Sequence, residues 1–166
     1  MAFCNYDHAA SYAYANKSKG AAIKQKIARK VKKEKLDKLK TNTDWARETE
    51  RSFNRYIGVR DRELDCGMCG KPINSNRHSC HYRSVGACKA LRFNTFNVVS
   101  GCHRCNVEQG GNLIEYRIRL VRRFGSDKVE WLESQNAPTR YSVEYLIRLK
   151  KIFNRRAKHL IKLRGY

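Results

Sequence analysis

Acidic side chains, proline and long apolar runs are all scarce in this 166-residue sequence. It has 15 Asp and Glu against 36 Lys and Arg, and it has 2 prolines. No window of about 18 apolar residues exists, so the sequence predicts no membrane-spanning helix. The opening stretch MAFCNYDHAASYAYANKSKG lacks the basic start and apolar centre of a secretory signal, so we expect a cytoplasmic protein.

The excess of positive charge is the strongest signal in the composition. The formal net charge is +21 and the pI is near 10.0. Residues 17–40 hold eleven basic and two acidic side chains, and residues 147–166 hold eight basic and no acidic ones. Lysine-rich helices can be merely solvated faces. Two such segments around a centre rich in Cys and His favour nucleic acid as the partner, because a polyanion offsets the self-repulsion. The cationic segments lack the dense apolar face that a membrane surface requires.

Specific basic side chains are candidates for contact with DNA phosphates. They lie in both cationic segments and on the helix expected between them. The predicted DNA-binding residues are Lys24, Lys26, Arg29, Lys30, Lys32, Lys33, Arg117, Arg122, Arg155 and Arg156.

Apolar periodicity predicts an α+β chain, mostly helical, around a small centre of short strands and loops. Thr43, Asn112 and Ser126 are the expected helix caps, and Gly125 is an expected helix end. The expected helices cover 18–40, 44–60, 113–124, 126–133 and a final stretch from 142; residues 1–16 have no clear period and are expected to be irregular, and 66–106 are expected to form short strands and loops. This divides the chain into a basic arm (1–43), a central core (44–134) and a basic C-terminal helix (135–166).

Two cysteine pairs frame the centre of the chain. Cys66 and Cys69 lie in CGMCG, Cys102 and Cys105 lie in CHRCN, and 32 residues separate the pairs. Two C-x-x-C turns supply four thiolates, which is typical of a closed structural zinc site. The odd total of seven cysteines and a reducing compartment argue against disulfides. We therefore expect Zn²⁺ to act as a scaffold and a treble-clef arrangement to surround it.

Polar residues inside this frame are candidates for catalysis. His81 and Arg83 would face the same side of a strand. A neutral imidazole can take a proton from water, and an Arg can hold a phosphate oxygen. Asn97 and Asn106 offer an amide that can pin a loop and a carbonyl oxygen suited to Mg²⁺. Each histidine could also be a plain surface residue.

These residues resemble the HNH, or ββα-metal, nuclease pattern. By position, the resemblance implies that His81 is the general base, that Asn97 braces the loop and that Asn106 ligates a catalytic ion. Cys80 stands where that family usually has an Asp ligand, and Cys is a poor ligand for Mg²⁺. His78 is the nearest substitute ligand.

A longer resemblance extends from about residue 44 to 133. The stretches DWARETERSFNRYIGVRDRELDCGMCG, HYRSVGACKALRFNTFN and CHRCNVEQGGNLIEYRIRLV look like the phage recombination endonuclease family NinG, also called Rap. This resemblance implies a zinc-bound HNH core and an endonuclease that cleaves branched DNA such as Holliday junctions and D-loops. It implies a phage or prophage protein acting in the cytoplasm of the bacterial host.

The resemblance and the residues together give a predicted mechanism with rivals. His81 activates water, Arg83 holds the phosphate charge, Asn106 and His78 hold Mg²⁺ or Mn²⁺, and the four cysteines hold Zn²⁺. The expected partner is branched or double-stranded DNA, and two cuts per junction suggest a homodimer through the C-terminal helix. The alternatives are a zinc-dependent DNA-binding module without hydrolysis and a less selective HNH nicking endonuclease.

Overall fold

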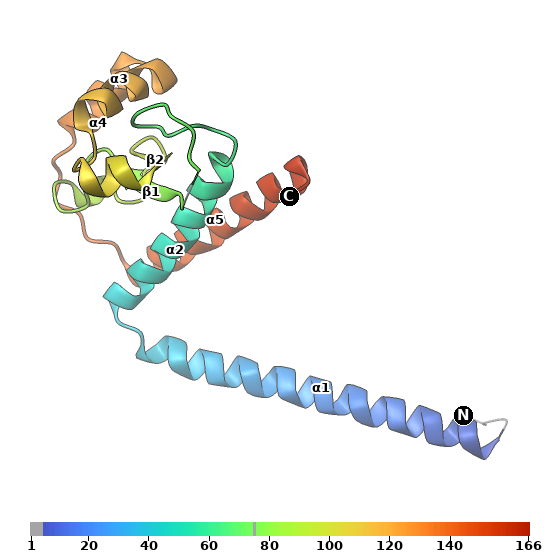
Figure 1. The fold of residues 1–166 in the computed structure, drawn as a ribbon. Helices are drawn as coiled ribbons and strands as arrows, with labels where there is room; N and C mark the ends of the chain where they lie inside the picture. The colour runs from blue at the N-terminus through green and yellow to red at the C-terminus, as the bar shows by residue number, and fades with distance from the viewer. Residues whose placement is uncertain (1–4, 75) are drawn as a thin grey trace. The chain divides into compact units, whose positions relative to one another are not determined.

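The structure is a computed structural model that describes residues 5–74 and 76–166, drawn in Figure 1. The chain divides after Thr41 into two compact units. This division lies two residues from the boundary predicted at 43, and residues 135–166 belong to the same unit as 42–134. No described helix is long and apolar enough to cross a membrane.

The first unit is a single helix, α1 (Tyr6–Leu39). The Oδ1 atom of Asn5 accepts from the backbone N–H of His8 at 2.8 Å and so caps the helix start. The expectation that residues 1–16 are irregular is wrong from Tyr6 onward, because this cap precedes a run rich in alanine, a strong helix former. Residues 1–4, with Cys4, lie outside the described part. Large apolar side chains of α1 are exposed: Ile23, Ile27, Val31, Leu36 and Leu39.

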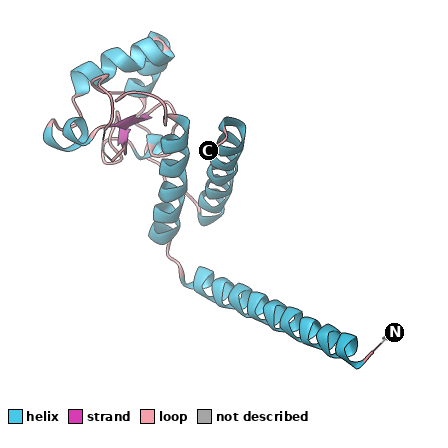
Figure 2. Cartoon of the chain, turned by 45° about the vertical axis from the view of Figure 1, so that its right-hand side comes forward, coloured by secondary structure: helices cyan, strands magenta, loops and turns pink. Residues whose placement is uncertain are grey.

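Helices α2 (Asn42–Arg60) and α5 (Val143–Arg164) pack side by side in the second unit (Figure 2). The Ser142 side chain caps α5 by accepting from the N–H of Tyr145 at 3.2 Å. Helix α2 begins at Asn42, so the predicted Thr43 cap is wrong and Thr43 is helical. Instead, Asn42 Nδ2 donates to the carbonyl of Tyr141 at 2.7 Å, which fixes the start of α2 to the segment before α5.

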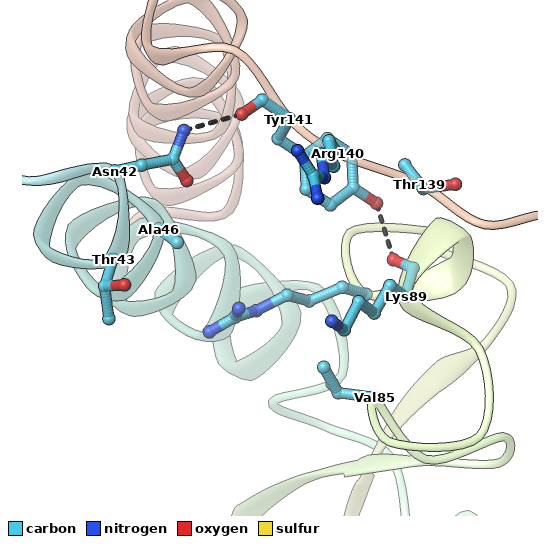
Figure 3. Close-up of a pocket in the computed structure, with 9 residues that line it drawn as sticks. Asn42, Thr43, Ala46, Val85, Lys89, Thr139, Arg140 and Tyr141 are labelled. Atoms are coloured by element: carbon cyan, nitrogen blue, oxygen red, sulfur yellow. Dashed lines mark hydrogen bonds between the residues drawn. The ribbon is translucent and has the colours of Figure 1, made fainter.

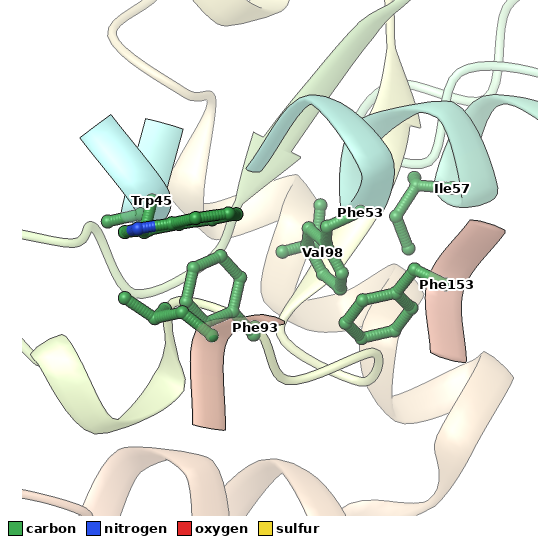
Figure 4. Packing of buried hydrophobic residues seen from close by; sticks show 8 residues of the cluster. Trp45, Phe53, Ile57, Phe93, Val98 and Phe153 are labelled. Atoms are coloured by element: carbon green, nitrogen blue, oxygen red, sulfur yellow. The ribbon is translucent and has the colours of Figure 1, made fainter. Parts of the chain in front are cut away.

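An aromatic cluster joins these helices to the strands. The rings of Phe53 and Phe153 meet edge to face, with centroids 4.9 Å apart. Figure 4 shows Phe53 and Ile57 of α2 packed against Val98 and Phe153. Trp45, Phe53 and Ile57 of α2 are buried in this cluster. Aromatic pairs of this geometry stabilise a core beyond their buried area.

Two short strands and several turns form the rest of the unit. Strand β1 (His78–His81) pairs antiparallel with β2 (Val98–Gly101), with His81 opposite Val98 and His78 opposite Gly101. A 3₁₀ turn, η1 (Lys89–Leu91), lies between them in the sequence, and a π-helical turn, η2 (Arg104–Glu108), follows β2. Helices α3 (Leu113–Phe124) and α4 (Ser126–Ser134) pack together, as Figure 1 shows.

Two of the expected caps differ in detail. The predicted helix end at Gly125 is confirmed, and Gly125 also precedes α4, so Ser126 is the first residue of that helix and not its cap. Asn112 does precede α3, but its side chain makes no capping bond, and its backbone is left-handed at φ 45°. Its Nδ2 instead lies 3.8 Å from Cys105 Sγ, so this turn faces the cysteine centre.

Candidate metal centre and active site

The side chains of Cys66, Cys69, Cys102 and Cys105 converge on one point. Their Sγ atoms all lie within 4.8 Å of one another, and Cys69 Sγ is 4.0 Å from Cys102 Sγ. Zn–S bonds of about 2.3 Å in a tetrahedron place the sulfurs roughly 3.8 Å apart, so the four thiols fit such an ion. The predicted convergence is confirmed, and the cluster could hold a metal ion such as zinc. Four thiolates leave no open position on the ion, which suits a structural role.

Backbone contacts shape the first cysteine pair into a metal-binding turn. The N–H of Gly70 donates to Cys66 O at 2.7 Å, and Gly70 has φ +72°, which glycine adopts without strain. The N–H of Cys102 donates to Cys66 Sγ at 3.3 Å. Burial alone would raise the pKa of Cys66, but backbone N–H donors such as this one lower it to about 7. These donors therefore favour the thiolate form of Cys66, the form that binds a metal ion.

The turn and the sheet approach each other closely. Gly67 N donates to Ser100 O at 2.9 Å, and a Cβ on Gly67 would lie 2.4 Å from Val99 Cγ2. A Cβ on Gly101 would lie 2.4 Å from Met68 Cε and 2.8 Å from Cys80 Sγ. Glycine is therefore required at both positions because a side chain would not fit, and not because of an unusual backbone conformation.

Cys80 is buried beside the cysteine centre. Burial and the nearby Cys66 and Cys102 raise the pKa of Cys80 to about 12, so it stays a neutral thiol at pH 7. A neutral thiol is a poor ligand. This agrees with the expectation that Cys80 does not replace the missing Asp.

His78 and His81 stand on opposite faces of β1, because side chains alternate along a strand. The ring of His78 lies beside that of His103, with centroids 5.5 Å apart. A role for His78 on a catalytic ion stays a prediction, and it would require the side chain to reach around the strand end. Asn106 is half-buried in η2, where its N–H donates to Cys102 O at 3.1 Å.

The imidazole of His81 has a defined tautomer. Its Nε2 lies 2.9 Å from the carbonyl oxygen of Arg92. A carbonyl only accepts, so Nε2 carries the proton and Nδ1 keeps its lone pair. Burial, stronger than the opposing effect of this hydrogen bond, lowers the pKa of His81 below its ordinary value. A neutral ring with one basic nitrogen is the form that a general base needs.

Asn97 fixes the loop that follows β1. Its Oδ1 accepts from the N–H of Arg83 at 2.9 Å, and its Nδ2 donates to Arg83 O at 2.9 Å and to Leu91 O at 3.3 Å. The side chain is fully buried. These are the contacts that a loop-bracing residue makes, and they join the end of β1 to η1.

Arg83 has a set of partners that the sequence did not indicate. Its Nη1 donates to the carbonyls of Leu132, Glu133 and Gln135 at 2.6–3.2 Å, and its Nη2 donates to Asn136 Oδ1 at 2.9 Å. The guanidinium thus satisfies the free carbonyls at the end of α4. Its predicted role on phosphate stays a prediction and requires these contacts to be given up.

Asp61 is a second residue that sequence reasoning missed. Its carboxylate accepts from Arg60 at two atoms, each at 2.7 Å, from Arg123 Nη2 at 2.6 Å and from the N–H of Ser100 at 3.0 Å. The residue is 1% exposed. It therefore joins the end of α2 to β2 and α3.

The predicted DNA-binding side chains are on the surface. Arg117 is paired with Glu133 at 2.8 Å, so its charge is partly compensated. The other predicted residues are exposed: Lys24, Lys26, Arg29, Lys30, Lys32 and Lys33 on α1, Arg122 on α3, and Arg155 and Arg156 on α5. Their contact with DNA stays a prediction.

The fold and the site together define a class: a basic, mostly helical protein with a two-stranded sheet and a cluster of four cysteines that could hold a metal ion. A family model described as "Bacteriophage Lambda NinG protein" matches residues 2–163, so the chain belongs to the NinG family. The chain is 33% identical over 122 residues to Protein ninG of Escherichia phage lambda, which covers 74% of this chain and 60% of that protein.

Other relatives give the same result. Protein ninG of Escherichia phage 933W is 33% identical and that of Salmonella phage P22 is 32% identical, each over 122 residues or 74% of this chain. The chain spans about three fifths of the length of these relatives, 61% and 60% respectively. No solved structure matches. Family membership was thus predicted correctly from the sequence motifs.

Proposed function

We propose that this protein is a metal-dependent DNA endonuclease that cleaves branched recombination intermediates such as Holliday junctions and D-loops. The observation that carries the proposal is the state of His81: Nε2 is held as a donor by Arg92 O, and Nδ1 is left as a base. The net charge of +21 supports a polyanionic substrate. The HNH-like order of His81, Asn97 and Asn106 supports phosphodiester hydrolysis.

The proposed reaction uses few groups. His81 Nδ1 takes a proton from a water molecule, the oxygen of that water attacks phosphorus in line, and the bond to the 3′ oxygen breaks. Asn106, with help from His78, would hold Mg²⁺ or Mn²⁺, which supplies charge stabilisation at the leaving oxygen. Asn97 keeps the loop after β1 in place. The cysteine centre holds Zn²⁺ and fixes β2 and η2 relative to β1.

Replacing His81 tests the proposal. The His81→Ala protein should keep its metal content and its affinity for a four-way junction, because the ring lies off the cysteine centre. It should lose junction cleavage by about 100-fold or more, the usual contribution of a general base. The matched control is His159→Ala on exposed α5, which should cleave normally. A fully active His81→Ala protein would sink the assignment.

A second candidate is a DNA-binding module without hydrolysis. The buried, neutral Cys80 at the place where HNH proteins usually have an Asp ligand favours it. Incubation of a junction with the wild-type protein and either Mg²⁺ or Mn²⁺ separates the two: no product with either ion supports binding alone. Junction, flap and linear duplex compared in one assay would reveal a less selective nicking endonuclease.

A further inference from the structure

A groove with cationic walls is lined in part by Arg92, whose carbonyl holds the His81 ring. It consists of two adjoining cavities of about 460 and 610 Å³, which is within the range of about 300–1,000 Å³ typical of ligand sites. Both are lined by Lys89, Thr139 and Arg140. The first also borders the start of α2, and the second borders residues 86–88 and 136–138. We call this pair of cavities the Lys89–Arg140 groove.

The walls of the groove carry positive charge. Lys89, Arg92 and Arg140 line the first cavity, and Lys89 and Arg140 line the second. Neither cavity is lined by an acidic residue. Among the described residues neither Lys89 nor Arg140 forms an ion pair. Arg92 is paired with Glu50 at 2.8 Å, but its buried Nε has no hydrogen-bond partner. Unpaired cations in a concave site attract an anion more strongly than they would on an open face.

The groove is held open by hydrogen bonds. Figure 3 shows Arg140 and Tyr141 on the segment before α5, Lys89 on η1, and Asn42 and Thr43 at the start of α2. Tyr141 Oη donates to Lys89 O at 2.7 Å, and Asn42 Nδ2 donates to Tyr141 O at 2.7 Å. Arg83 fastens the far wall through Gln135 and Asn136. A ligand would therefore enter a preformed site and pay little ordering entropy.

The position of the groove connects it with His81. Arg92, whose side chain lines the first cavity, offers its carbonyl to His81 Nε2 at 2.9 Å. Asn97 bonds both Leu91 in η1 and Arg83, so the same turn supports the groove and the histidine. A ligand in the groove would therefore contact the same turn that orients the His81 ring.

We propose that the Lys89–Arg140 groove binds the sugar-phosphate backbone of one nucleic-acid strand, with Lys89 and Arg140 on its phosphates. Two cavities that meet at these cations suit a chain with regularly spaced charges better than a single small anion. None of the three cations belongs to the set predicted from the charged segments. The binding stands without catalysis; the further idea that it delivers the strand to His81 rests on the proposed function.

The test is a binding measurement with the 166-residue protein, loaded with zinc and without added Mg²⁺ or Mn²⁺. The variant is Lys89→Gln with Arg140→Gln, and the probes are a labelled four-way junction and a linear duplex. The matched control is Arg51→Gln with Arg55→Gln, which removes the same charge from the exposed side of α2. Each phosphate contact contributes about 0.9 to the slope of log affinity against log salt.

We expect the groove variant to lower that slope by roughly 1 to 2 and to weaken binding about tenfold, while the control changes neither. The zinc content and circular dichroism spectrum of the groove variant should match those of the wild type. A Lys89→Arg variant, which keeps the positive charge, should bind with the affinity of the wild type. Equal loss in variant and control, or no DNA binding by the wild type, overturns the proposal. So does displacement of the junction by polyglutamate at equal charge, which would indicate an acidic protein partner.

The binding result for the groove variant can be distinguished from the cleavage result for His81→Ala. Loss of binding in the groove variant together with full cleavage by His81→Ala would keep the groove and reject the proposed base. Normal binding by the groove variant together with loss of cleavage by His81→Ala would do the reverse.

Discussion

At Asp61 a buried carboxylate accepts hydrogen bonds from two arginines and a backbone amide. Burial alone would raise the pKa of Asp61, but the bonds and charges of Arg60 and Arg123 outweigh it and lower the pKa below its ordinary value of 3.8. The folded state therefore binds the proton less tightly than the unfolded state. The resulting stabilisation is present above pH 3.8 and is lost as the pH falls through the lower folded pKa.

Asp61→Asn should lower the free energy of unfolding by about 1.5–3 kcal/mol, because Arg60 and Arg123, whose side chains are 16% and 29% exposed, lose their charged hydrogen-bond acceptor. Urea unfolding at pH 7 measures this loss. The difference between wild type and variant should shrink as the pH drops below 3.8. The control Asp65→Asn alters an exposed carboxylate and should change stability by less than about 0.5 kcal/mol. An unchanged midpoint for Asp61→Asn would mean that the network is dispensable.

At the scale of elements, we expect the β1–β2 pair to depend on a metal ion held by the four cysteines. Each strand has four residues, and an isolated two-stranded sheet is marginal in water. Cys66 and Cys69 precede β1 and Cys102 and Cys105 follow β2, so both cysteine pairs connect to the end of the sheet where His78 pairs with Gly101. In such a site the free energy of metal binding contributes directly to folding.

Cys105→Ser should therefore abolish stoichiometric zinc binding and unfold the region of the sheet, as measured by metal analysis and by loss of chemical-shift dispersion for β1 and β2. Cys88→Ser is the matched control, since Cys88 is buried but lies outside the cluster, and it should keep about one zinc per chain. Full zinc content in Cys105→Ser would contradict the four-cysteine assignment.

The packing of α5 within the chain limits how the predicted homodimer could form. Leu146, Phe153 and Ala157 of α5 are buried, and α5 packs on α2 within the chain. A dimer formed through this helix would have to use its other side, where Tyr145 and Leu163 are exposed.

At the scale of the whole molecule, the two units differ in what stabilises them. Helix α1 has 34 residues, and the apolar side chains that it presents at Ile23, Ile27 and Leu39 are 57–79% exposed. A helix without burial relies on local propensity and frays readily. Residues 42–166 contain the aromatic cluster, the cysteine centre and the Asp61 network.

Amide hydrogen exchange should show this contrast directly. Amides of α1 should exchange within seconds to minutes, and amides of α2 and β2 should exchange far more slowly. Addition of junction DNA should slow exchange in α1, since phosphates would neutralise the repulsion among its lysines. Protection in α1 without DNA, equal to that in α2, would show that this helix is stabilised by contacts beyond its own turns.

Sequence patterns predicted the features that depend on near neighbours. The predictions were correct for the convergence of the four cysteines, the helix end at Gly125 and the start of α5 after Ser142. Spacing and capping act over a few residues and are therefore visible in the sequence. Residues 6–16 were misread, since the cap at Asn5 and the alanine content outweigh the missing apolar stripe. Catalytic roles for His81 and Asn97 stay predictions, and the structure adds the acceptor that fixes the tautomer of His81.

Features that depend on distant partners could not be predicted. Asp61 meets Arg123 across 62 positions, and Arg83 meets Glu133 across 50; nothing local marks either pair. Lys89 and Arg140 look like ordinary surface charges in the sequence. They form one groove only because Tyr141 and Asn42 join η1, the segment before α5 and the start of α2.

The close approach at Gly67 and Gly101 has a consequence for how this sequence can vary. A methyl group at Gly67 would collide with Val99, and one at Gly101 would collide with Met68 and Cys80; all three neighbours are buried. In a library of random variants, those that remain folded should therefore keep glycine at positions 67 and 101 even when neighbouring positions accept substitutions. Alleles that carry alanine there would be expected to work only at reduced temperature, where a strained centre still holds its ion.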